Sequence, residues 1–451
     1  MTEKREKELW EQQLLVTATG APKALLANAI TALKHAPGWF RCLAFDVFSR
    51  RVMIIQDPPI NTKQLNWQPR AWTPDDDILV TDWLHHHGIA VNVPTAAQAV
   101  ESVAKEQEFH PVADYLNELQ HDGIARARTW PSVYLGSELS PYFMAVGQAM
   151  LIAAVARIYE PGCKVDTVPI LEGAQGARKS TAVKALFDPW FTDELADLGS
   201  KDACLQTQGV WGVEVSELDA MTRGEVSKIK AFISRTTDRF RPPYGQRVIE
   251  APRECVFWGT TNSDSYLKDE TGGRRFWPIK IGKIDVDGLI RDRDQLWAEA
   301  RALFEKGTAW WLAKDDILKQ AEDQQRGRYI GDPWERHVAD YVDTSADGDV
   351  TIDAILRNAL ELPISHCGQA EMNRVARVLR SLGLVRVQVR RGDKRVWIYR
   401  KPVTAPVGFP EGWPVTSGKP VTPDAPVTPE WPAAQAQSSE SPLSPLEKEF
   451  G

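Results

Sequence analysis

Cysteine is scarce in this 451-residue sequence: there are five cysteines, and no two of them form a CxxC pair. This spacing argues against a disulfide framework or a structural zinc site and predicts free thiols in a reducing compartment. No apolar run reaches the roughly 18 residues that span a bilayer. The charged first residues, MTEKREKELWEQQ, lack the apolar stretch of a secretory signal. We therefore expect a cytoplasmic protein without membrane contact.

A surplus of positive charge is missing as well, because the formal net charge is −7. That balance excludes a uniformly basic coat for nucleic acid, but it is compatible with a local basic face. The hydrophobic fraction of 43% and the charged fraction of 25% indicate globular domains with ample core. The length exceeds that of one ordinary domain, so we expect about two to four folded units.

Composition and periodicity divide the chain into five segments. Residues 1–125 are expected to be mostly helical around a strand-like pair, CLAFDVFSRRVMIIQ. Residues 126–315 alternate β-rich runs with helical segments, which predicts an α/β domain with a mainly parallel sheet. A helical connector at 316–345 leads to residues 346–401, where two helical segments and the hairpin pattern LVRVQVRRGDKRVWIYR indicate a winged-helix module. Residues 402–451 hold 11 of the 30 prolines, which predicts a disordered tail.

The octapeptide GAQGARKS at 173–180 resembles a phosphate-binding loop (P-loop), since it follows the strand-like VPILE and precedes the helical STAVKALF. In such a loop Lys179 would reach the β- and γ-phosphates of ATP, and the Ser180 hydroxyl would hold Mg²⁺. The pattern GxxxxGK[ST] has glycine where this chain has Arg178, and whether an arginine fits that turn stays open here. The expected ATP-binding residues are Gly173, Ala174, Gln175, Gly176, Ala177, Arg178, Lys179, Ser180 and Thr181.

An acidic side chain at the tip of a neighbouring strand would activate the attacking water and help to hold the metal. The run GVWGVEVSELDA predicts Glu217 as this catalytic base. Glu214 lies three residues earlier, so we expect it on the opposite face of the strand, as a structural or partner-facing charge. Ser216 stands where a metal-binding aspartate would be expected, so magnesium would be held there only through water. The candidate metal ligands are therefore Ser180 and Glu217.

Two further groups complete the expected catalytic set. Asn262 ends the run CVFWGTTN and could sense the γ-phosphate, although a helix-capping asparagine is the alternative. Arg274 and Arg275 follow a Gly-Gly turn and suit a loop that reaches the γ-phosphate of a neighbouring subunit. An arginine in that role is worth about 10³–10⁵ in rate. A surface salt-bridge pair is the alternative.

Two basic stretches are candidates for DNA binding. In FISRTTDRFRPPYGQR, Arg239, Arg241 and Tyr244 combine charge with an aromatic ring, as single-strand binding requires, although a subunit interface would use the same residues. Residues 374–401 contain ten basic residues and one acidic residue. Contact with backbone phosphates is the functional interpretation of this second stretch, and a solvated basic face is the alternative. Its expected DNA-binding residues are Arg377, Arg380, Arg390, Arg391, Lys394 and Arg395.

Seven ordered blocks between residues 109 and 311 resemble the virulence-associated protein E family, the helicase part of phage and genomic-island primase-helicases. They are HPVADYLNEL, RIYEPGCKVD, LEGAQGARKST, VEVSELDAM, KIKAFISRTTDRFRPPYG, PRECVFWGTTN and YLKDETGGRRFWP. The resemblance implies ATP hydrolysis coupled to DNA replication, in a layout similar to superfamily 3 helicases, which act as rings. By this resemblance Lys179, Ser180, Glu217, Asn262 and Arg275 inherit the loop, base, sensor and finger roles, with Arg274 as a second candidate for the finger.

The chain also departs from that family. Members often have glycine at the position of Arg178, and full primase-helicases carry paired metal-binding aspartates that are missing here, where Asp46 stands alone. Any primase would therefore be a separate protein. The leading hypothesis is an ATP-driven, ring-forming DNA helicase for a phage, prophage or mobile element. The alternatives are a DNA-binding replication initiator or regulator that uses ATP only to assemble, and a structural or packaging adaptor with an inactive nucleotide fold.

Overall fold

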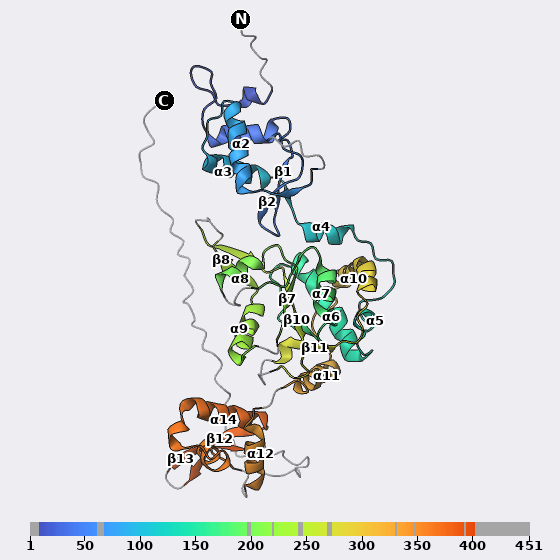
Figure 1. Cartoon of the computed structure of the whole chain (residues 1–451), viewed down its shortest axis with the longest axis vertical. Helices are drawn as coiled ribbons and strands as arrows, with labels where there is room; N and C mark the ends of the chain where they lie inside the picture. Colours follow the sequence, from blue (N-terminus) through green and yellow to red (C-terminus); the bar gives the residue numbers. More distant parts are fainter. Residues whose placement is uncertain are drawn as a thin grey trace, which may run out of the picture.

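The computed structural model of the chain describes residues 9–60, 67–195, 200–218, 221–241, 247–267, 273–329, 332–345, 349–391 and 394–401. In these residues the chain forms an N-terminal unit, a central α/β unit and a C-terminal unit, which follow one another along the long axis of the molecule (Figure 1). The expected proline-rich tail at 402–451 lies outside the described residues.

The N-terminal unit packs three helices against a small sheet. The elements are the 3₁₀ turn η1 (Glu11–Gln13), α1 (Leu26–His35), β1 (Leu43–Asp46), β2 (Arg51–Ile54), β3 (Arg70–Ala71), α2 (Pro74–His86), α3 (Val93–Ala104) and β4 (Glu108–Phe109), with sheet order β3-β2-β1-β4. The strand-like pair expected from the sequence is the antiparallel pair β1–β2. Asp46 closes the turn between these strands: its carboxylate accepts hydrogen bonds from the Phe48 N–H at 2.9 Å and the Ser49 hydroxyl at 2.6 Å.

A five-stranded parallel sheet forms the centre of the molecule and confirms the α/β prediction. Its strands are β5 (Val168–Glu172), β6 (Phe191–Thr192), β7 (Gly212–Val215), β10 (Val256–Thr261) and β11 (Phe276–Lys280). The order is β11-β5-β10-β7-β6, and every neighbouring pair is parallel. The loops that follow β5, β10 and β7 therefore emerge side by side at one edge of the sheet, the usual place for a ligand in such folds.

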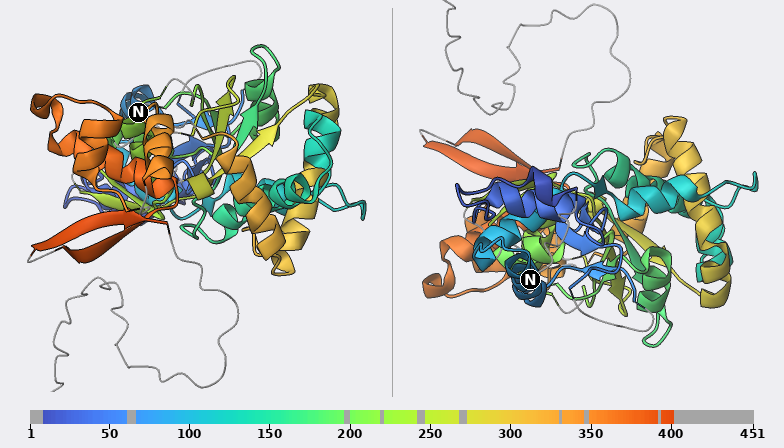
Figure 2. Two further views of the ribbon diagram at one scale, coloured as in Figure 1. Left: turned by 90° about the horizontal axis from the view of Figure 1, so that it is seen from below. Right: turned by 90° about the horizontal axis from the view of Figure 1, so that it is seen from above.

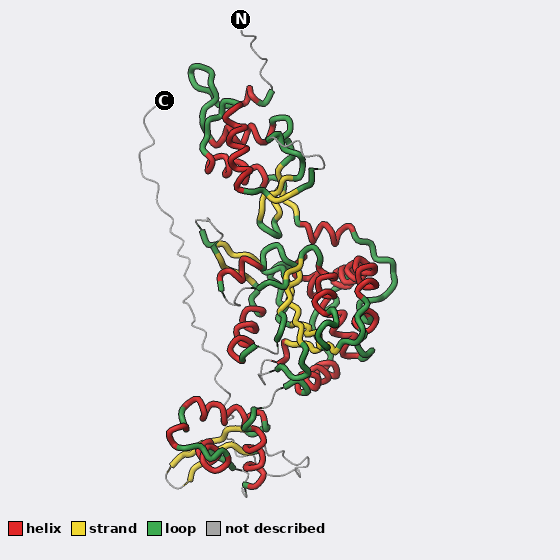
Figure 3. Tube along the Cα trace, viewed as in Figure 1, coloured by secondary structure: helices red, strands yellow, loops and turns green. Residues whose placement is uncertain are grey.

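Helices lie on both sides of this sheet (Figure 3). They are α4 (Pro111–Glu118), α5 (Trp130–Leu135), α6 (Pro141–Tyr159), α7 (Lys179–Phe187), α8 (Lys201–Gln206), α9 (Arg223–Ile233), α10 (Val286–Glu305) and α11 (Asp315–Arg326), joined by the 3₁₀ turn η2 (Gly273–Arg275) and the hairpin β8 (Thr237–Phe240) and β9 (Ile249–Pro252). β7 passes close to α7, because a Cβ atom at Gly212 would lie only 2.3 Å from the Phe187 ring. Glycine at this position lets the strand pack directly on the helix.

Helix α6 corrects the expectation that no apolar stretch is long enough to span a bilayer. With 19 residues and a mean hydropathy of 1.4, it is long and apolar enough to cross a membrane by length and composition. However, 78% of its apolar window is buried inside the protein. The Ala154 carbonyl in α6 also accepts a hydrogen bond of 2.9 Å from the Trp211 indole. A helix that is apolar on all sides and covered by its neighbours is a core helix.

The C-terminal unit joins short helices to a long two-stranded hairpin. Its elements are α12 (Glu335–Thr344), α13 (Ile352–Ala354), the π-helical turn η3 (Ile355–Ala359), the 3₁₀ turn η4 (Ile364–His366), α14 (Gln369–Ser381), β12 (Val385–Arg391) and β13 (Lys394–Arg400). The antiparallel pair β12–β13 forms where the sequence alternation predicts it. The two helices of the expected connector at 316–345 pack on different units. Ile317 and Ala321 of α11 belong to the core of the central unit. Val338 and Val342 of α12 belong to the core of the C-terminal unit.

Candidate functional site

The loop between β5 and α7 has two residues with positive φ, Gly176 and Arg178. β5 is buried along its whole length, so the strand fixes the start of the loop. Gly176 has a φ of +79°, and nothing lies within 4 Å of the place where its Cβ would be. Arg178 precedes α7 with φ 65° and ψ 27°, the left-handed conformation that favours glycine. The sequence left the fit of Arg178 open, and in the structure the arginine adopts this left-handed conformation.

The Arg178 side chain is exposed and does not plug the loop. Among the described residues, its guanidinium makes no hydrogen bond or ion pair. Arg178 nevertheless lines the same cavity as Lys179 and Ser180. The site therefore carries a second cation next to the loop lysine.

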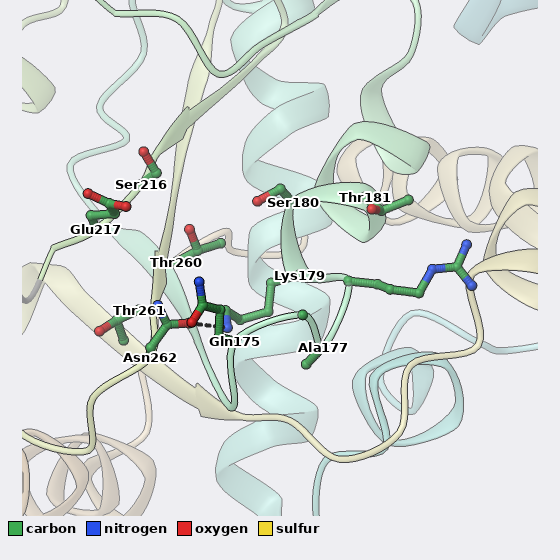
Figure 4. A pocket seen from close by; sticks show the side chains of 12 residues that line it. Gln175, Ala177, Lys179, Ser180, Thr181, Ser216, Glu217, Thr260, Thr261 and Asn262 are labelled. Atoms are coloured by element: carbon green, nitrogen blue, oxygen red, sulfur yellow. Dashed lines mark hydrogen bonds between the residues drawn. The ribbon is translucent and has the colours of Figure 1, made fainter.

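Lys179 is buried and lies inside the loop. Its ammonium donates hydrogen bonds to the carbonyl oxygens of Gly173 at 2.8 Å and Ala174 at 2.9 Å, and to Oδ1 of Asn262 at 2.9 Å. Figure 4 shows Lys179 directed toward Asn262 at the tip of β10. The expected loop and sensor residues thus meet directly, because β10 is the immediate neighbour of β5 in the sheet.

The direction of the Glu214 side chain differs from the expectation. We expected it to face away from the site, but its Oε1 accepts hydrogen bonds of 2.7 Å from the hydroxyls of Ser180 and Thr260. The side chain is buried, and its Oε2 has no hydrogen-bond partner among the described residues. A buried carboxylate with an unsatisfied oxygen beside a serine hydroxyl is the donor set that a hard cation such as Mg²⁺ uses.

The reason for this error is the place where β7 ends. The strand stops at Val215, and Glu217 has a φ of 54°, so the chain turns before it reaches Glu217. The alternation of side chains along a strand therefore does not extend from Glu214 to Glu217. Glu217 is exposed and lies next to Ser216, on the side of the cavity across from Ser180 (Figure 4). Glu217 therefore lines the cavity itself, whereas Glu214 contacts two residues that line it, Ser180 and Thr260.

The loop residues, Glu217 and Asn262 line one cavity with a volume of about 410 Å³. Its size falls in the usual range for small-molecule sites, roughly 300–1,000 Å³. Seven of the nine expected ATP-binding residues line it, and the other two, Gly173 and Ala174, provide the carbonyls that hold Lys179. The lining residues are Gln175, Gly176, Ala177, Arg178, Lys179, Ser180, Thr181, Ser216, Glu217, Thr260, Thr261 and Asn262.

Arg274 and Arg275 lie at the amino-terminal ends of the strands, whereas the cavity lies at the carboxyl-terminal ends. They directly precede β11, whose first residue, Phe276, is the register partner of Val168 at the start of β5. Arg275 is 3.6 Å from Asp166, measured between Nε and Oδ2, and Arg274 is exposed. Neither arginine lines the cavity, so their proposed action on ATP depends on a second copy of the chain.

The candidate DNA-binding residues are found in two places. In the β8–β9 hairpin, Arg239 forms an exposed ion pair of 3.0 Å with Glu250, and Arg241 is exposed, whereas Tyr244 lies outside the described residues. Phe240, the aromatic residue between these two arginines, is buried. In the C-terminal unit the described side chains Arg377, Arg380, Arg390 and Arg395 are exposed, and the side chains of Arg391 and Lys394 lie outside the described part.

The parallel sheet with helices on both sides defines an α/β domain. The family model of the virulence-associated protein E-like domain matches residues 116–329, which contain this sheet. The chain therefore carries a virulence-associated protein E-like domain, and the family predicted from its sequence blocks is confirmed.

The chain also shows likeness to solved structures at low identity. One is the apo structure of the NrS-1 C-terminal region (305-718), with 11% identity, 80% of this chain and 96% of that chain covered, and a TM-score of 0.44. Another is the A form apo structure of the same NrS-1 region, with 10% identity, the same coverage and a TM-score of 0.42. No curated protein matches the chain by sequence.

Proposed function

We propose that this protein is a P-loop ATPase and DNA helicase that acts in the replication of a phage, prophage or mobile genetic element. The observation that carries the proposal is that Lys179, Glu217 and Asn262, from the ends of three neighbouring strands, line one cavity. The buried Glu214 is hydrogen-bonded to Ser180 of the same cavity. The virulence-associated protein E-like domain supports the same assignment.

Each residue has a distinct task in ATP hydrolysis. Lys179 exchanges its contacts with Gly173 and Ala174 for the β- and γ-phosphates, and the amides of the loop surround the phosphate oxygens. Ser180 and Glu214 are the residues that would hold Mg²⁺, which supplies charge compensation for the phosphates. Glu217 takes a proton from the water that attacks the γ-phosphorus, while the bond to the β–γ bridging oxygen breaks. Asn262 exchanges its contact with Lys179 for the γ-phosphate or the attacking water.

The position of Arg274 and Arg275 supports a ring of identical subunits with ATP between them. Since both arginines lie at the sheet edge opposite the loop, each subunit would present its arginines to the cavity of the next. The C-terminal unit, with α14 followed by the basic β12–β13 hairpin, is proposed to act as a winged-helix module on DNA. A cytoplasmic location in a bacterial or phage-infected cell follows from this function.

ATP hydrolysis by purified variants tests the catalytic assignment. Lys179→Ala is expected to abolish turnover while DNA binding persists, and Lys184→Ala, which removes an exposed lysine from the same helix, is the matched control. Glu217→Gln is expected to bind ATP but not to hydrolyse it or displace a strand from forked DNA. Glu214→Gln is expected to raise the magnesium concentration needed for half-maximal rate. Wild-type activity in Lys179→Ala would refute the assignment.

The same measurements separate the helicase from the alternative functions. Hydrolysis by a helicase is expected to rise when single-stranded DNA is added, with particle size showing a ring. Slow hydrolysis at the same rate with and without single-stranded DNA would instead identify an initiator or regulator that uses ATP to assemble. Absence of nucleotide binding in calorimetry would leave only the adaptor.

A further inference from the structure

The β12–β13 hairpin carries an exposed tryptophan among cations. The register pairs Gln388 with Trp397 and Arg390 with Arg395, and the side chains of directly paired residues lie on the same face of a two-stranded sheet. Gln388, Arg390, Arg395 and Trp397 are all exposed, Trp397 to 48%. Figure 2 shows the hairpin projecting from the rest of the molecule in both views. This face is therefore open to a large ligand.

Trp397 already holds one cation. The Arg386 guanidinium carbon lies 4.3 Å from the centre of its ring. Such a pair at an exposed site can simply stabilise a hairpin. However, nearly half of Trp397 remains exposed beside this arginine, so the indole can still accept a second flat partner.

The cations of the C-terminal unit differ in whether the protein itself neutralises them. Arg374 is paired with Asp332 at 2.7 Å, Arg400 with Asp349 at 2.9 Å and Lys401 with Asp343 at 2.9 Å. These ion pairs remove three of the ten basic residues from consideration as DNA contacts. Among the described residues, Arg386 and Arg395 form no ion pair. The same holds for the exposed Arg377 and Arg380 of α14, so two of these four arginines, Arg386 and Arg395, lie on the hairpin that carries Trp397.

Arg395 and Trp397 are two residues apart on β13, so their side chains share a face of the hairpin. Arg386 lies over the Trp397 ring on the same face. This face therefore offers two guanidinium groups to an anionic ligand. A tryptophan beside an anion-binding face is the combination that single-stranded nucleic acid recognises, with the phosphates on the cations and a base on the ring. Duplex DNA offers phosphates but no exposed base face.

We propose that Trp397, Arg386, Gln388 and Arg395 form a site for an unpaired nucleotide, in which a base stacks on Trp397 and the flanking phosphates contact Arg386 and Arg395. The Gln388 amide lies next to the stacked base and supplies a hydrogen bond to its edge. This site rests on the proposed DNA-binding function of the C-terminal unit and makes it specific. The hairpin then binds DNA where the strands have separated.

Binding of fluorescent DNA to the full-length protein tests this site without ATP. Trp397→Ala is expected to weaken binding of an oligothymidine about 5- to 100-fold, the effect of losing one base stack, and to leave a blunt duplex within about twofold. Trp397→Phe should restore part of the loss, since phenylalanine also stacks. Trp311→Ala, which removes an exposed tryptophan of the central unit, is the matched control and should change neither affinity.

Arg395→Gln provides the electrostatic comparison. It is expected to weaken both ligands and to lower the salt dependence of binding by about one phosphate contact. If Trp397→Ala left the oligothymidine affinity unchanged while Arg395→Gln reduced it, the face would bind phosphates alone and the stacking site would be refuted. A wild-type protein that bound neither ligand would instead refute DNA as the partner. Absence of ATP hydrolysis would count against the ATPase without affecting this result.

Discussion

Replacing Arg178 by glycine is expected to stabilise the protein, because the native backbone at this residue is left-handed. The φ of 65° costs a non-glycine residue about 1–2 kcal/mol. Glycine removes this strain but increases the conformational entropy of the unfolded chain, at a cost of about 0.5–1 kcal/mol. The guanidinium forms no hydrogen bond or ion pair with the described residues, so its removal loses no contact of that kind. The net gain is therefore about 0.5–1 kcal/mol.

Thermal unfolding of the central unit measures this gain. For a unit of this size the expected rise in Tm is about 1–3 °C. Arg178→Ala is the matched control, because alanine removes the guanidinium but keeps the left-handed strain, and it should show no rise. Gly176→Ala is the reverse case: space is open around its Cβ position at φ +79°, so the loss of about 1 kcal/mol expected there comes from the backbone alone.

The difference in stability between the two Arg178 variants is the critical result. If Arg178→Gly were no more stable than Arg178→Ala, the loop would not make its left-handed turn at this residue in solution. ATP affinity is a separate readout. A guanidinium that contributes to phosphate binding predicts the same loss of affinity in both variants, since both lack it. Arg178→Gly would then be more stable than the wild type and bind ATP more weakly.

The remaining predictions concern buried groups. Arg328→Met is expected to lower the free energy of unfolding by about 3–5 kcal/mol, because it leaves the buried carboxylate of Glu172 without its ion-pair partner. Thermal unfolding measures this loss, and a loss below about 1 kcal/mol would contradict the burial of this pair. Tyr266→Phe removes one hydrogen bond of 2.7 Å to the same carboxylate and should cost about 1–2 kcal/mol by the same assay. Burial raises the pKa of the Cys255 thiol to about 11, so little thiolate forms near neutral pH. Iodoacetamide should therefore modify the half-buried Cys367 and spare Cys255 in mass spectrometry of the folded protein, and early labelling of Cys255 would contradict this.

The sequence predicts best where a structure depends on neighbouring residues. The β5–α7 unit requires only a strand, a turn and a helix start within a short stretch, and the order strand–GAQGARKS–helix shows all three. The β12–β13 hairpin is local in the same sense, since its alternation and its Gly-Asp pair define both strands and the turn position. In both cases the contacts that stabilise the structure lie close together in the sequence.

Side-chain direction near the end of a strand is harder to predict. The expectation for Glu214 assumed that β7 continues to Glu217, whereas the strand ends at Val215. Which strand lies beside β7 was equally unknown, and it is β10 that places the Thr260 hydroxyl against Glu214. The available signal in the sequence was the apolar run GVWGVEV, which places Glu214 inside a strand that becomes buried. A carboxylate inside a buried strand needs hydrogen-bond donors nearby.

The charge count of the C-terminal segment shows a second limit of sequence reasoning. The ten basic residues at 374–401 predicted contact with backbone phosphates, but Asp332, Asp343 and Asp349 neutralise three of them from outside the counted stretch. A local count cannot include partners that the fold supplies from elsewhere. Trp397 was missed for the related reason that an aromatic residue in an alternating strand is usually a core residue.

Glu172 shows that even the most local motif of this protein depends on a distant contact. It is the last residue of β5 and directly precedes Gly173, so its position sets where the β5–α7 loop begins. Arg328, 156 residues away, donates to both of its carboxylate oxygens at 2.7 Å. The Arg328 carbonyl also accepts hydrogen bonds from the N–H groups of Tyr266 and Leu267, just beyond the strand tip that bears Asn262. Arg328 thus holds the start of the β5–α7 loop and the segment after β10 in a fixed relation, which the octapeptide alone cannot provide.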